Sequence, residues 1–452
     1  MNIANKTIFT GDNLPILRGI NSECIDLIYL DPPFNSNANY AAPIGSQAAG
    51  AEFKDTWSLS DLDVAWLVLI ETKYPTVNRV IQAAMTDSDK SYLIYMATRL
   101  LEMHRILKSD GSIYLHCDST MSHYLKLLMD AIFGKKNFRN EIVWQRLHGG
   151  GKTTQHKPIS YGPTTDHILF YSYPNSKFDI DSDLVPYSED YLKSFKHRDE
   201  KGMYARRSPF NSPGQGARPN QCYEYKGFFP PHPSGWNVTR PTLEKMDAKG
   251  DLEFVNGKVY RKKRLKGGKR ADNLWLDVPP ALGKERTGYP TQKPLKLLER
   301  IIKASSDKDS IVFDPFCGCA TTCVAADKLQ RNWIGIDISP KAVELVVDRI
   351  KEAQGLFQNI IHRTDIPKRT DLGNIPLYNT PANKTTLYGE QSGNCNGCNT
   401  HFETQHLEID HIIAKSVGGT DHIGNLQLLC GNCNRIKGNR GQEYLIAKLA
   451  ER

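Results

Sequence analysis

Apolar and polar residues alternate along the first 145 residues in the manner of an α/β domain. The apolar runs at Ile25–Leu30 and at residues 112–116 predict strands. The pattern between them predicts a helix from about residue 92 to residue 107, which ends at a turn formed by Asp110 and Gly111.

The α/β pattern returns over residues 286–360. The predicted helices there are 295–305, 321–330 and 340–353, and the predicted strands are 311–313 and 333–336.

Residues 146–285 separate these two halves and differ from them in composition. They are rich in Gly and Pro, with runs at 149–151, 209–219 and 229–235, and they predict a loop-rich insert with short β segments. A polar linker at 361–386 then leads to a compact tail at 387–452. The expected fold class is therefore α/β, with an insert and a small second domain.

The composition narrows the class of protein. The chain has 452 residues, of which 39% are hydrophobic and 24% are charged, which excludes a fibrous repeat and a mostly disordered chain. The longest apolar run near the N-terminus, 64–70, is far short of the roughly 20 residues that span a bilayer. The first residues also lack a signal-peptide pattern. We expect a cytoplasmic protein whose ten cysteines are thiols or metal ligands.

The net charge of +8 is concentrated in one region. Residues 190–275 hold 19 Lys or Arg against nine Asp or Glu, a balance of +10, so the rest of the chain is about neutral. A basic region on a neutral protein favours a polyanionic partner, most simply nucleic acid. A solvated lysine-rich loop is the alternative.

Residues 311–322 predict a strand, a turn of small residues and the start of a helix. Such a turn lets a ligand approach the backbone at the positive end of a helix. A second predicted strand ends at Asp337, where an acid can hold a pair of ribose hydroxyls. The G-x-G-x-x-G spacing of nicotinamide sites is absent, and a purely structural turn remains the alternative.

The tetrapeptide Asp31-Pro32-Pro33-Phe34 follows the apolar strand at Ile25–Leu30. Its prolines lack amide donors, which leaves carbonyl acceptors beside the acid, and Phe34 offers a ring face to a flat partner. A carboxylate and a proline carbonyl can accept both N–H groups of an exocyclic base amine, while the ring stacks on a base turned out of the duplex. Taken alone, the motif is better explained as a proline turn that closes a buried strand.

The motifs together resemble the amino-group DNA methyltransferases that use S-adenosylmethionine. The resemblance covers residues 7–355 and rests on these segments: Thr10-Gly11-Asp12-Asn13, D-P-P-F, 111–118, Phe133-Gly134, 140–144, Thr291-Gln292-Lys293-Pro294 and the D-P-F-C-G-C-A-T-T turn at 314–322. The catalytic motif precedes the cofactor motif, as in the β-ordered subgroup, and residues 111–144 are similar to the modification subunits of type III restriction systems. That similarity and D-P-P-F favour adenine N6 over cytosine N4.

The resemblance implies a Rossmann-like sheet and a set of roles. Asp31 and Pro32 would orient the amine, Pro33 completes the motif, and Phe34 would stack on the base. The cofactor residues implied are Asp12, Lys293, Asp314, Phe316, Gly318, Thr321, Thr322 and Asp337. Ala320 departs from the family, which most often has Gly there, and cofactor affinity falls if this position needs a positive φ.

The family places target recognition between the two halves of its sheet. In this chain that slot is the basic insert, 146–285, between a catalytic half at 1–145 and a cofactor half at 286–360. The candidate phosphate-binding residues are Arg261, Lys262, Lys263, Arg264 and Lys266. A hairpin tip that faces solvent is the alternative for this run.

Two C-x-x-C pairs lie in the tail. Cys395, Cys398, Cys430 and Cys433 have the spacing of a tetrahedral zinc site, since four thiolates satisfy one ion. A redox role for one pair is the alternative, but it leaves the other pair unexplained.

Residues 387–438 resemble the HNH nucleases, whose ββα-metal fold is clamped by a four-cysteine zinc. The resemblance implies that His411 is a general base that Asn425 orients, and that Asp410 and Asn434 bind magnesium or a similar divalent ion. The last family position is often His, so Asn434 weakens the expectation of activity.

We therefore expect a site-specific DNA methyltransferase that also carries a nuclease domain. The alternatives are a methyltransferase whose tail only binds DNA, and a non-catalytic DNA-binding protein. Double-stranded DNA is the expected partner. The resemblance also allows a homodimer and a separate restriction or helicase subunit, because the chain has no P-loop.

Overall fold

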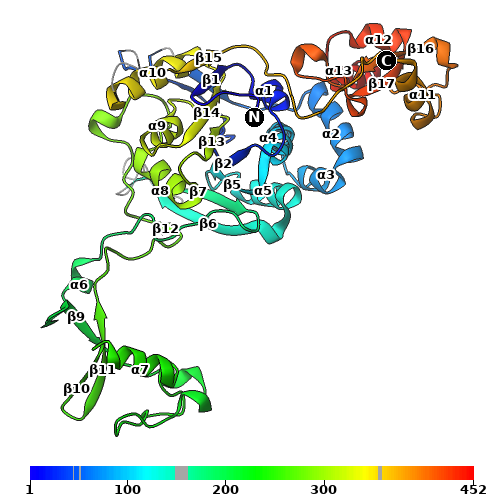
Figure 1. The fold of residues 1–452 in the computed structure, drawn as a ribbon. Coiled ribbons are helices and arrows are strands. Elements are labelled where there is room, and N and C mark those ends of the chain that lie inside the picture. The colour runs from blue at the N-terminus through cyan, green and yellow to red at the C-terminus, as the bar shows by residue number, and fades with distance from the viewer. Residues whose placement is uncertain (44, 50–51, 148–160, 355–358, 452) are drawn as a thin grey trace. The chain divides into compact units, whose positions relative to one another are not determined.

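The computed structural model describes residues 1–43, 45–49, 52–147, 161–354 and 359–451 (Figure 1). The glycine run at 149–151 lies outside these residues. The chain divides into two compact units, one of Met1–Ser182 with Asp272–Arg452 and one of Asp183–Ala271.

The first unit is built on a nine-stranded sheet. Its order is β12 (Leu274–Trp275), β6 (Phe138–Gln145), β7 (Thr165–Ser172), β5 (Leu107–Cys117), β2 (Ile25–Leu30), β13 (Ile311–Asp314), β14 (Asn332–Asp337), β1 (Thr7–Thr10) and β15 (Ile361–Arg363). Neighbouring strands are parallel, except that β7 runs antiparallel to β5 and β6. A small hairpin, β3 (Ala38–Ala41) with β4 (Glu52–Asp55), follows β2.

Helices cover both faces of this sheet (Figure 1). One face carries α1 (Asn13–Gly19), α3 (Pro75–Gln82), α4 (Asp87–Ile106) and α5 (Ser122–Met129), with α2 (Asp61–Lys73) beside α3, and the other carries α8 (Leu295–Ser305), α9 (Thr321–Lys328) and α10 (Pro340–Gln354). Alternation along β2 divides the core, because Ile28 packs in the cluster of Leu100 from α4 while Leu27 packs in the cluster of Ile301 from α8. This arrangement confirms the expected α/β fold.

The turn predicted at Asp110 and Gly111 lies inside β5 instead of ending the helix. Helix α4 ends at Ile106, and β5 pairs with β2 on both sides of the turn, first at Leu107 and again from Ser112. The turn therefore projects from the strand as an irregularity, because strand pairing resumes after it.

The second unit, Asp183–Ala271, is smaller than the predicted insert of 146–285. It holds an antiparallel sheet in the order β10 (Leu252–Val255), β11 (Lys258–Arg264), β9 (Gly202–Arg207) and β8 (His197–Asp199), with helices α6 (Glu189–Leu192) and α7 (Arg240–Ala248). The flanking strands β7 and β12 belong to the sheet of the first unit, because their edges pair with β5 and β6.

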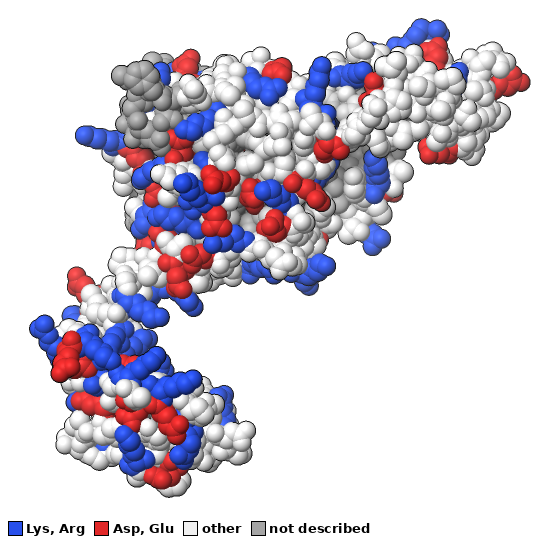
Figure 2. Space-filling model, in the orientation of Figure 1, with Lys and Arg blue, Asp and Glu red and all other residues white. Residues whose placement is uncertain are grey.

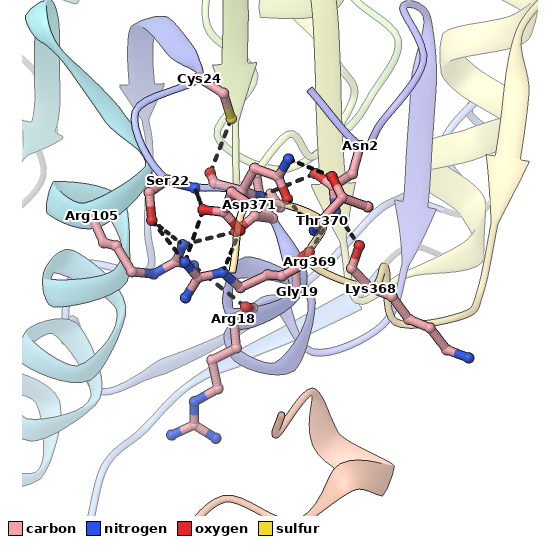
Figure 3. A network of polar contacts seen from close by, with 12 residues as sticks. Asn2, Arg18, Gly19, Ser22, Cys24, Arg105, Lys368, Arg369, Thr370 and Asp371 are labelled. Carbon is pink, nitrogen blue, oxygen red and sulfur yellow. Dashed lines mark hydrogen bonds and ion pairs between the residues drawn. The ribbon is translucent and has the colours of Figure 1, made fainter. Parts of the chain in front are cut away.

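The residues that follow β15 are docked along the N-terminal segment (Figure 3). Asn2 donates to the carbonyls of Gly19 and Lys368, the Ser22 amide donates to Asp371 at 2.8 Å, and Arg369 donates to Ser22. Gly19 is required here, since a Cβ would lie 2.0 Å from the carbonyl oxygen of Pro367. The first part of the predicted linker is thus a bound segment of the sheet domain.

The C-terminal tail forms a small domain around a separate core that includes Leu407, Leu428 and Leu445. Its elements are α11 (Pro381–Glu390), the hairpin of β16 (Leu407–His411) and β17 (Leu426–Cys430), α12 (Gly431–Lys437) and α13 (Gln442–Ala450). The hairpin followed directly by α12 gives the expected ββα arrangement.

Candidate active site

The sequence motifs meet at the carboxyl ends of the parallel strands β1, β2, β13 and β14, where ligands bind in open α/β sheets. A cavity of about 670 Å³ opens there. It is lined by every predicted residue of the methyltransferase motifs: Asp12, Asp31, Pro32, Pro33, Phe34, Lys293, Asp314, Phe316, Gly318, Thr321, Thr322 and Asp337. The fold therefore brings the two halves of the chain to one cavity.

Lys293 contacts the acid of the D-P-P-F motif. Its Nζ lies 2.8 Å from Oδ1 and 2.7 Å from Oδ2 of Asp31, and it also donates to the carbonyl of Thr291. Only 7% of the Lys293 side chain and 17% of the Asp31 side chain are exposed, so water screens this ion pair weakly. The same ammonium lies 5.1 Å from the centre of the Phe34 ring. The sequence assigned Lys293 to the cofactor, whereas its contacts here are with the catalytic motif.

A buried network of hydrogen-bonded side chains lies against the Phe34 ring. The Phe34 ring stacks on His116 at 6.0 Å with an interplanar angle of 14°. His116 bonds Tyr29 through Nδ1 at 2.9 Å and Asp166 through Nε2 at 3.1 Å. Burial lowers the pKa of His116, and the nearby Lys293 lowers it further. The ring is thus fixed at both nitrogens and provides a rigid, uncharged platform for Phe34.

Asp55 holds the loop that follows the motif. Its carboxylate accepts from the amides of Phe34, Asn35 and Ser36, at 3.2, 2.7 and 2.8 Å, and from the Trp57 indole. Asp55 is 1% exposed. Sequence reasoning missed this residue because no motif surrounds it, and only the fold of the β3–β4 hairpin brings it to the loop.

The cofactor half of the cavity carries two acids. Burial raises the pKa of Asp314 to about 7, and Thr322 and the Phe316 amide donate to its carboxylate. Burial also raises the pKa of Asp337, which accepts from the Gly318 amide at 2.7 Å. The buried carboxyl of Asp314 and the partly buried one of Asp337, beside an open cavity, suit a ligand that carries positive charge and hydroxyl groups.

Ala320 occupies a backbone position that favours glycine. Its φ is +56° and ψ is +35°, so it adopts the left-handed conformation immediately before α9. Gly318 has a positive φ of 51°, and a Cβ there would lie 3.0 Å from the Tyr289 ring. Position 320 therefore does need a positive φ, and we expect alanine in place of the family's glycine to reduce cofactor affinity.

Asp12 is fixed by Arg99. The carboxylate caps α1 through the Leu14 amide and pairs with Arg99 at 2.8 Å, while Arg99 also donates to Asn13. The guanidinium lies 3.4 Å from the centre of the Tyr95 ring. Sequence reasoning missed Arg99, Tyr95, Trp57 and Tyr289, which also line the cavity. Arg99 and Tyr95 lie within a predicted helix, where a helical pattern alone gives no sign of a binding role.

The four cysteines of the tail form one cluster. The sulfur atoms of Cys395, Cys398, Cys430 and Cys433 lie within 4.8 Å of one another. Backbone amides point at them: Gly397 and Cys430 donate to Cys395, and Cys433 donates to Cys430. Four converging thiols with amide donors fit a tetrahedral zinc ion.

His411 pairs with an acid that the sequence did not single out. Its Nε2 lies 2.7 Å from Oδ1 of Asp421, which also pairs with Lys415. Asn425 accepts from the Ile413 amide and donates to the carbonyls of Ile413 and Thr420. Asn425 thus fixes the loop after His411, while Asp421 contacts the imidazole.

The predicted ligands of the divalent ion have other partners in the described residues. Oδ2 of Asp410 accepts from Gln427 at 3.0 Å and pairs with Lys437 at 3.0 Å. Lys437 is fully buried, and Asn434 donates to Glu408. Mg²⁺ is usually held by one or two carboxylates together with waters and substrate phosphates, so the role of Asp410 and Asn434 as ligands of a divalent ion stays a prediction.

The basic run lies mostly in a strand. Arg261, Lys262, Lys263 and Arg264 belong to β11, and Lys266 follows it, so the run is not the tip of a hairpin.

No helix in the described part of the chain is both long and apolar enough to cross a membrane.

Comparisons with known proteins agree with these motifs. The family model described as DNA methylase (N6_N4_Mtase) matches residues 25–348, and the HNH endonuclease model matches residues 395–440. The type II methyltransferase M.EcaI of Enterobacter cloacae is 33% identical over 293 residues, which are 63% of this chain and 63% of that protein. The Mod subunit of the type III restriction-modification enzyme StyLTI of Salmonella typhimurium is 26% identical over 73% of this chain and 51% of its own length. The chain thus spans between half and two thirds of these two relatives.

Other relatives share more of their length with this chain. The DNA adenine methyltransferase YhdJ of Escherichia coli is 25% identical over 77% of this chain and 83% of its own. Among solved structures, the PvuII DNA methyltransferase, described as cytosine-N4-specific, is 15% identical with a TM-score of 0.38, covering 79% of this chain and 89% of that one. On the match over residues 25–348, the chain belongs to the N6_N4_Mtase family of DNA methylases, and it carries an HNH endonuclease domain over residues 395–440.

Proposed function

We propose that the protein transfers a methyl group from S-adenosylmethionine to the exocyclic amine of a base in double-stranded DNA. The observation that carries this proposal is the cavity that joins the D-P-P-F motif to the acids Asp314 and Asp337. The membership of the DNA methylase family supports it. The reducing cytoplasm is the compartment that suits such an enzyme.

The cavity residues divide into two groups. Asp314, Phe316, Gly318, Thr321, Thr322 and Asp337 hold the cofactor, with Asp12 near its adenine. S-adenosylmethionine supplies an electrophilic methyl group when bound. The carboxyl groups of Asp314 and Asp337 would favour its positive charge, and Asp337 would accept hydrogen bonds from its ribose hydroxyls.

The D-P-P-F motif holds the target amine. The base leaves the duplex and stacks on Phe34, whose ring is backed by His116. The amine donates to the Asp31 carboxylate and the Pro32 carbonyl, which orients the nitrogen lone pair toward the methyl group. The new N–C bond forms as the S–C bond breaks, and the proton lost from nitrogen passes to Asp31 or solvent. Lys293 positions the carboxylate through two hydrogen bonds.

Adenine N6 is the target that the sequence favours. The D-P-P-F motif and the match to type III Mod subunits support it, as does the match to a DNA adenine methyltransferase. Restriction-modification is the corresponding biological role. The partners that this role allows are a separate restriction or helicase subunit and a second copy of this protein.

The test is transfer of a labelled methyl group to unmodified duplex DNA. Wild type should label the DNA, and Asp31→Ala should lose the label while still binding S-adenosylmethionine. Asp307→Ala, an exposed acid outside the cavity, is the matched control and should keep full activity. Unlabelled DNA with a protein that binds the cofactor would contradict the proposal.

DNA cleavage by the HNH domain is a second function, favoured by the His411–Asp421 pair at 2.7 Å. Asp421 orients the imidazole so that the other nitrogen can take a proton from water. Strand breaks that need an added divalent ion and disappear in His411→Ala would establish it. Unchanged DNA binding without any breaks would leave a tail that only binds DNA.

A further inference from the structure

The basic strand of the second unit has two different faces. In the antiparallel pair of β9 and β11, Arg207 lies opposite Arg261, Ala205 opposite Lys263, Arg206 opposite Lys262, and Tyr204 opposite Arg264. Residues directly opposite share a face, and successive residues alternate. Arg207, Arg261 and Lys263 therefore lie on one face. Arg198 of β8 lies on the same face, because it is opposite Met203, which alternates with Ala205 and Arg207 along β9. We call these four residues the open face, and Arg206, Lys262 and Arg264 the paired face.

The basic side chains of the paired face form ion pairs with acids of the same unit. Arg264 pairs with Asp199 through two bonds of 2.7 Å, and Lys262 pairs with the same carboxylate at 2.9 Å. Arg206 makes a two-pronged contact with Glu253 at 2.9 and 2.6 Å. Hydrogen bonds from Arg264 and Lys262 hold the pKa of Asp199 far below its usual range. These cations stabilise the sheet and are already matched by acids.

The basic side chains of the open face lack such acidic partners in the described part of the chain. Among the residues that the structure describes, no ion pair joins Arg198, Arg207, Arg261 or Lys263 to an acid. Arg198, Arg261 and Lys263 are exposed. Arg207 and Arg261 lie directly opposite each other, an arrangement that costs energy unless an anion lies between them.

Two tyrosines extend the open face. The Lys263 ammonium and the Arg207 guanidinium each lie 5.7 Å from the centre of the Tyr191 ring, which stacks on Tyr187 at 5.0 Å. The Lys263 side chain lowers the pKa of Tyr191 by hydrogen bonding. Figure 2 shows Lys and Arg gathered over this unit, with acids among them. Cations beside tyrosine hydroxyls match the oxygen-rich surface of a sugar–phosphate chain.

We propose that the open face binds the phosphate backbone of duplex DNA, and that the paired face is structural. This inference rests on the proposed function, since it identifies the surface that holds the substrate. Because successive residues of a strand point to opposite faces, the proposal separates the basic run into two sets. Arg261 and Lys263 contact phosphate, whereas Lys262 and Arg264 do not.

The test is DNA binding by the full-length protein as a function of salt. Fluorescence anisotropy with a labelled, unmodified duplex is measured without cofactor and without added divalent ions. Each phosphate contact contributes about 0.9 to the slope of log affinity against log salt. The Arg261→Ala/Lys263→Ala variant should therefore bind more weakly, with a slope smaller by about 1.8. The Lys245→Ala/Lys258→Ala variant removes two exposed lysines from the same unit and should keep the wild-type slope.

One charge-conserving variant and a measurement of thermal melting separate binding from folding. Arg261→Lys/Lys263→Arg keeps the charges and should keep the slope, and thermal melting should be unchanged in all of these variants. A wild-type slope in Arg261→Ala/Lys263→Ala would overturn the proposal, as would tighter binding to duplex RNA than to duplex DNA.

The binding assay is independent of methyl transfer. A protein that binds DNA through the open face but transfers no methyl group contradicts the proposed function alone. A protein that methylates DNA with full affinity after Arg261→Ala/Lys263→Ala contradicts the open face alone.

Discussion

The Nζ of Lys293 lies 2.8 and 2.7 Å from the two carboxylate oxygens of Asp31, although the residues are 262 positions apart in the chain. This contact ties the T-Q-K-P motif of the second half to the D-P-P-F motif of the first. Under the proposed function, it also places Lys293 beside the target amine.

Lys293→Met should impair methyl transfer more than cofactor binding. Loss of the ammonium leaves the buried Asp31 carboxylate unpaired, and we expect kcat to fall by roughly 10- to 100-fold. The Kd for S-adenosylmethionine, measured by calorimetry, should change by less than about twofold. Lys296→Met, a half-exposed lysine in α8, is the control. A large rise in that Kd with an unchanged kcat would instead make Lys293 a cofactor ligand, as its motif first indicated.

The affinity for S-adenosylmethionine should depend on pH through Asp314. Burial raises the pKa of this carboxyl to about 7, so the free protein is partly protonated near neutrality. A cationic ligand favours the ionised form, so affinity should fall as the pH drops below about 7 and level off above it. Calorimetric titrations over this range measure the effect. Asp314→Asn should bind weakly at every pH, with a flatter profile, and an unchanged slope in that variant would count against the assignment.

Ala320→Gly should stabilise the protein. The left-handed φ of Ala320 costs about 1–2 kcal/mol relative to glycine, which exceeds the entropic cost of glycine in the unfolded chain. We expect a gain of about 0.5–1 kcal/mol in the free energy of unfolding and tighter cofactor binding. Ala326→Gly, within α9, should lose about 1 kcal/mol. Denaturant titrations compare the two, and equal losses would mean that position 320 carries no strain.

Zinc should hold the C-terminal domain together. Cys430→Ala removes one of four converging thiols, so we expect less bound zinc and proteolysis within residues 387–452 while the sheet domain persists. Metal analysis and limited proteolysis measure both effects. Cys222→Ala alters an exposed thiol of the second unit and should leave the zinc content unchanged. Full zinc retention by Cys430→Ala would exclude the four-cysteine site.

Local patterns predicted much of the fold. The helix predicted at 295–305 matches α8, and the strands around 311–313 and 333–336 match β13 and β14 within one residue at each end, because Gly, Pro and apolar periodicity mark their limits. The turn at Asp110 and Gly111 was placed at a helix end because sequence cannot show that strand pairing resumes beyond it.

Motifs predicted the site only where its residues are adjacent in sequence. D-P-P-F and the turn at 314–322 were found, whereas Asp55, Arg99 and Asp421 were missed because tertiary packing alone brings them to their partners. The division of the basic run into two faces likewise depends on the register of β9 against β11.

The most direct test of the central claim is single-molecule sequencing of unmodified plasmid after incubation with the protein and S-adenosylmethionine. The account predicts N6-methyladenine at one fixed sequence with wild type and none with Asp31→Ala. Plasmid that stays unmodified with a folded, cofactor-bound wild-type protein would contradict the account. N4-methylcytosine at a fixed sequence would preserve the methyltransferase and overturn the choice of adenine.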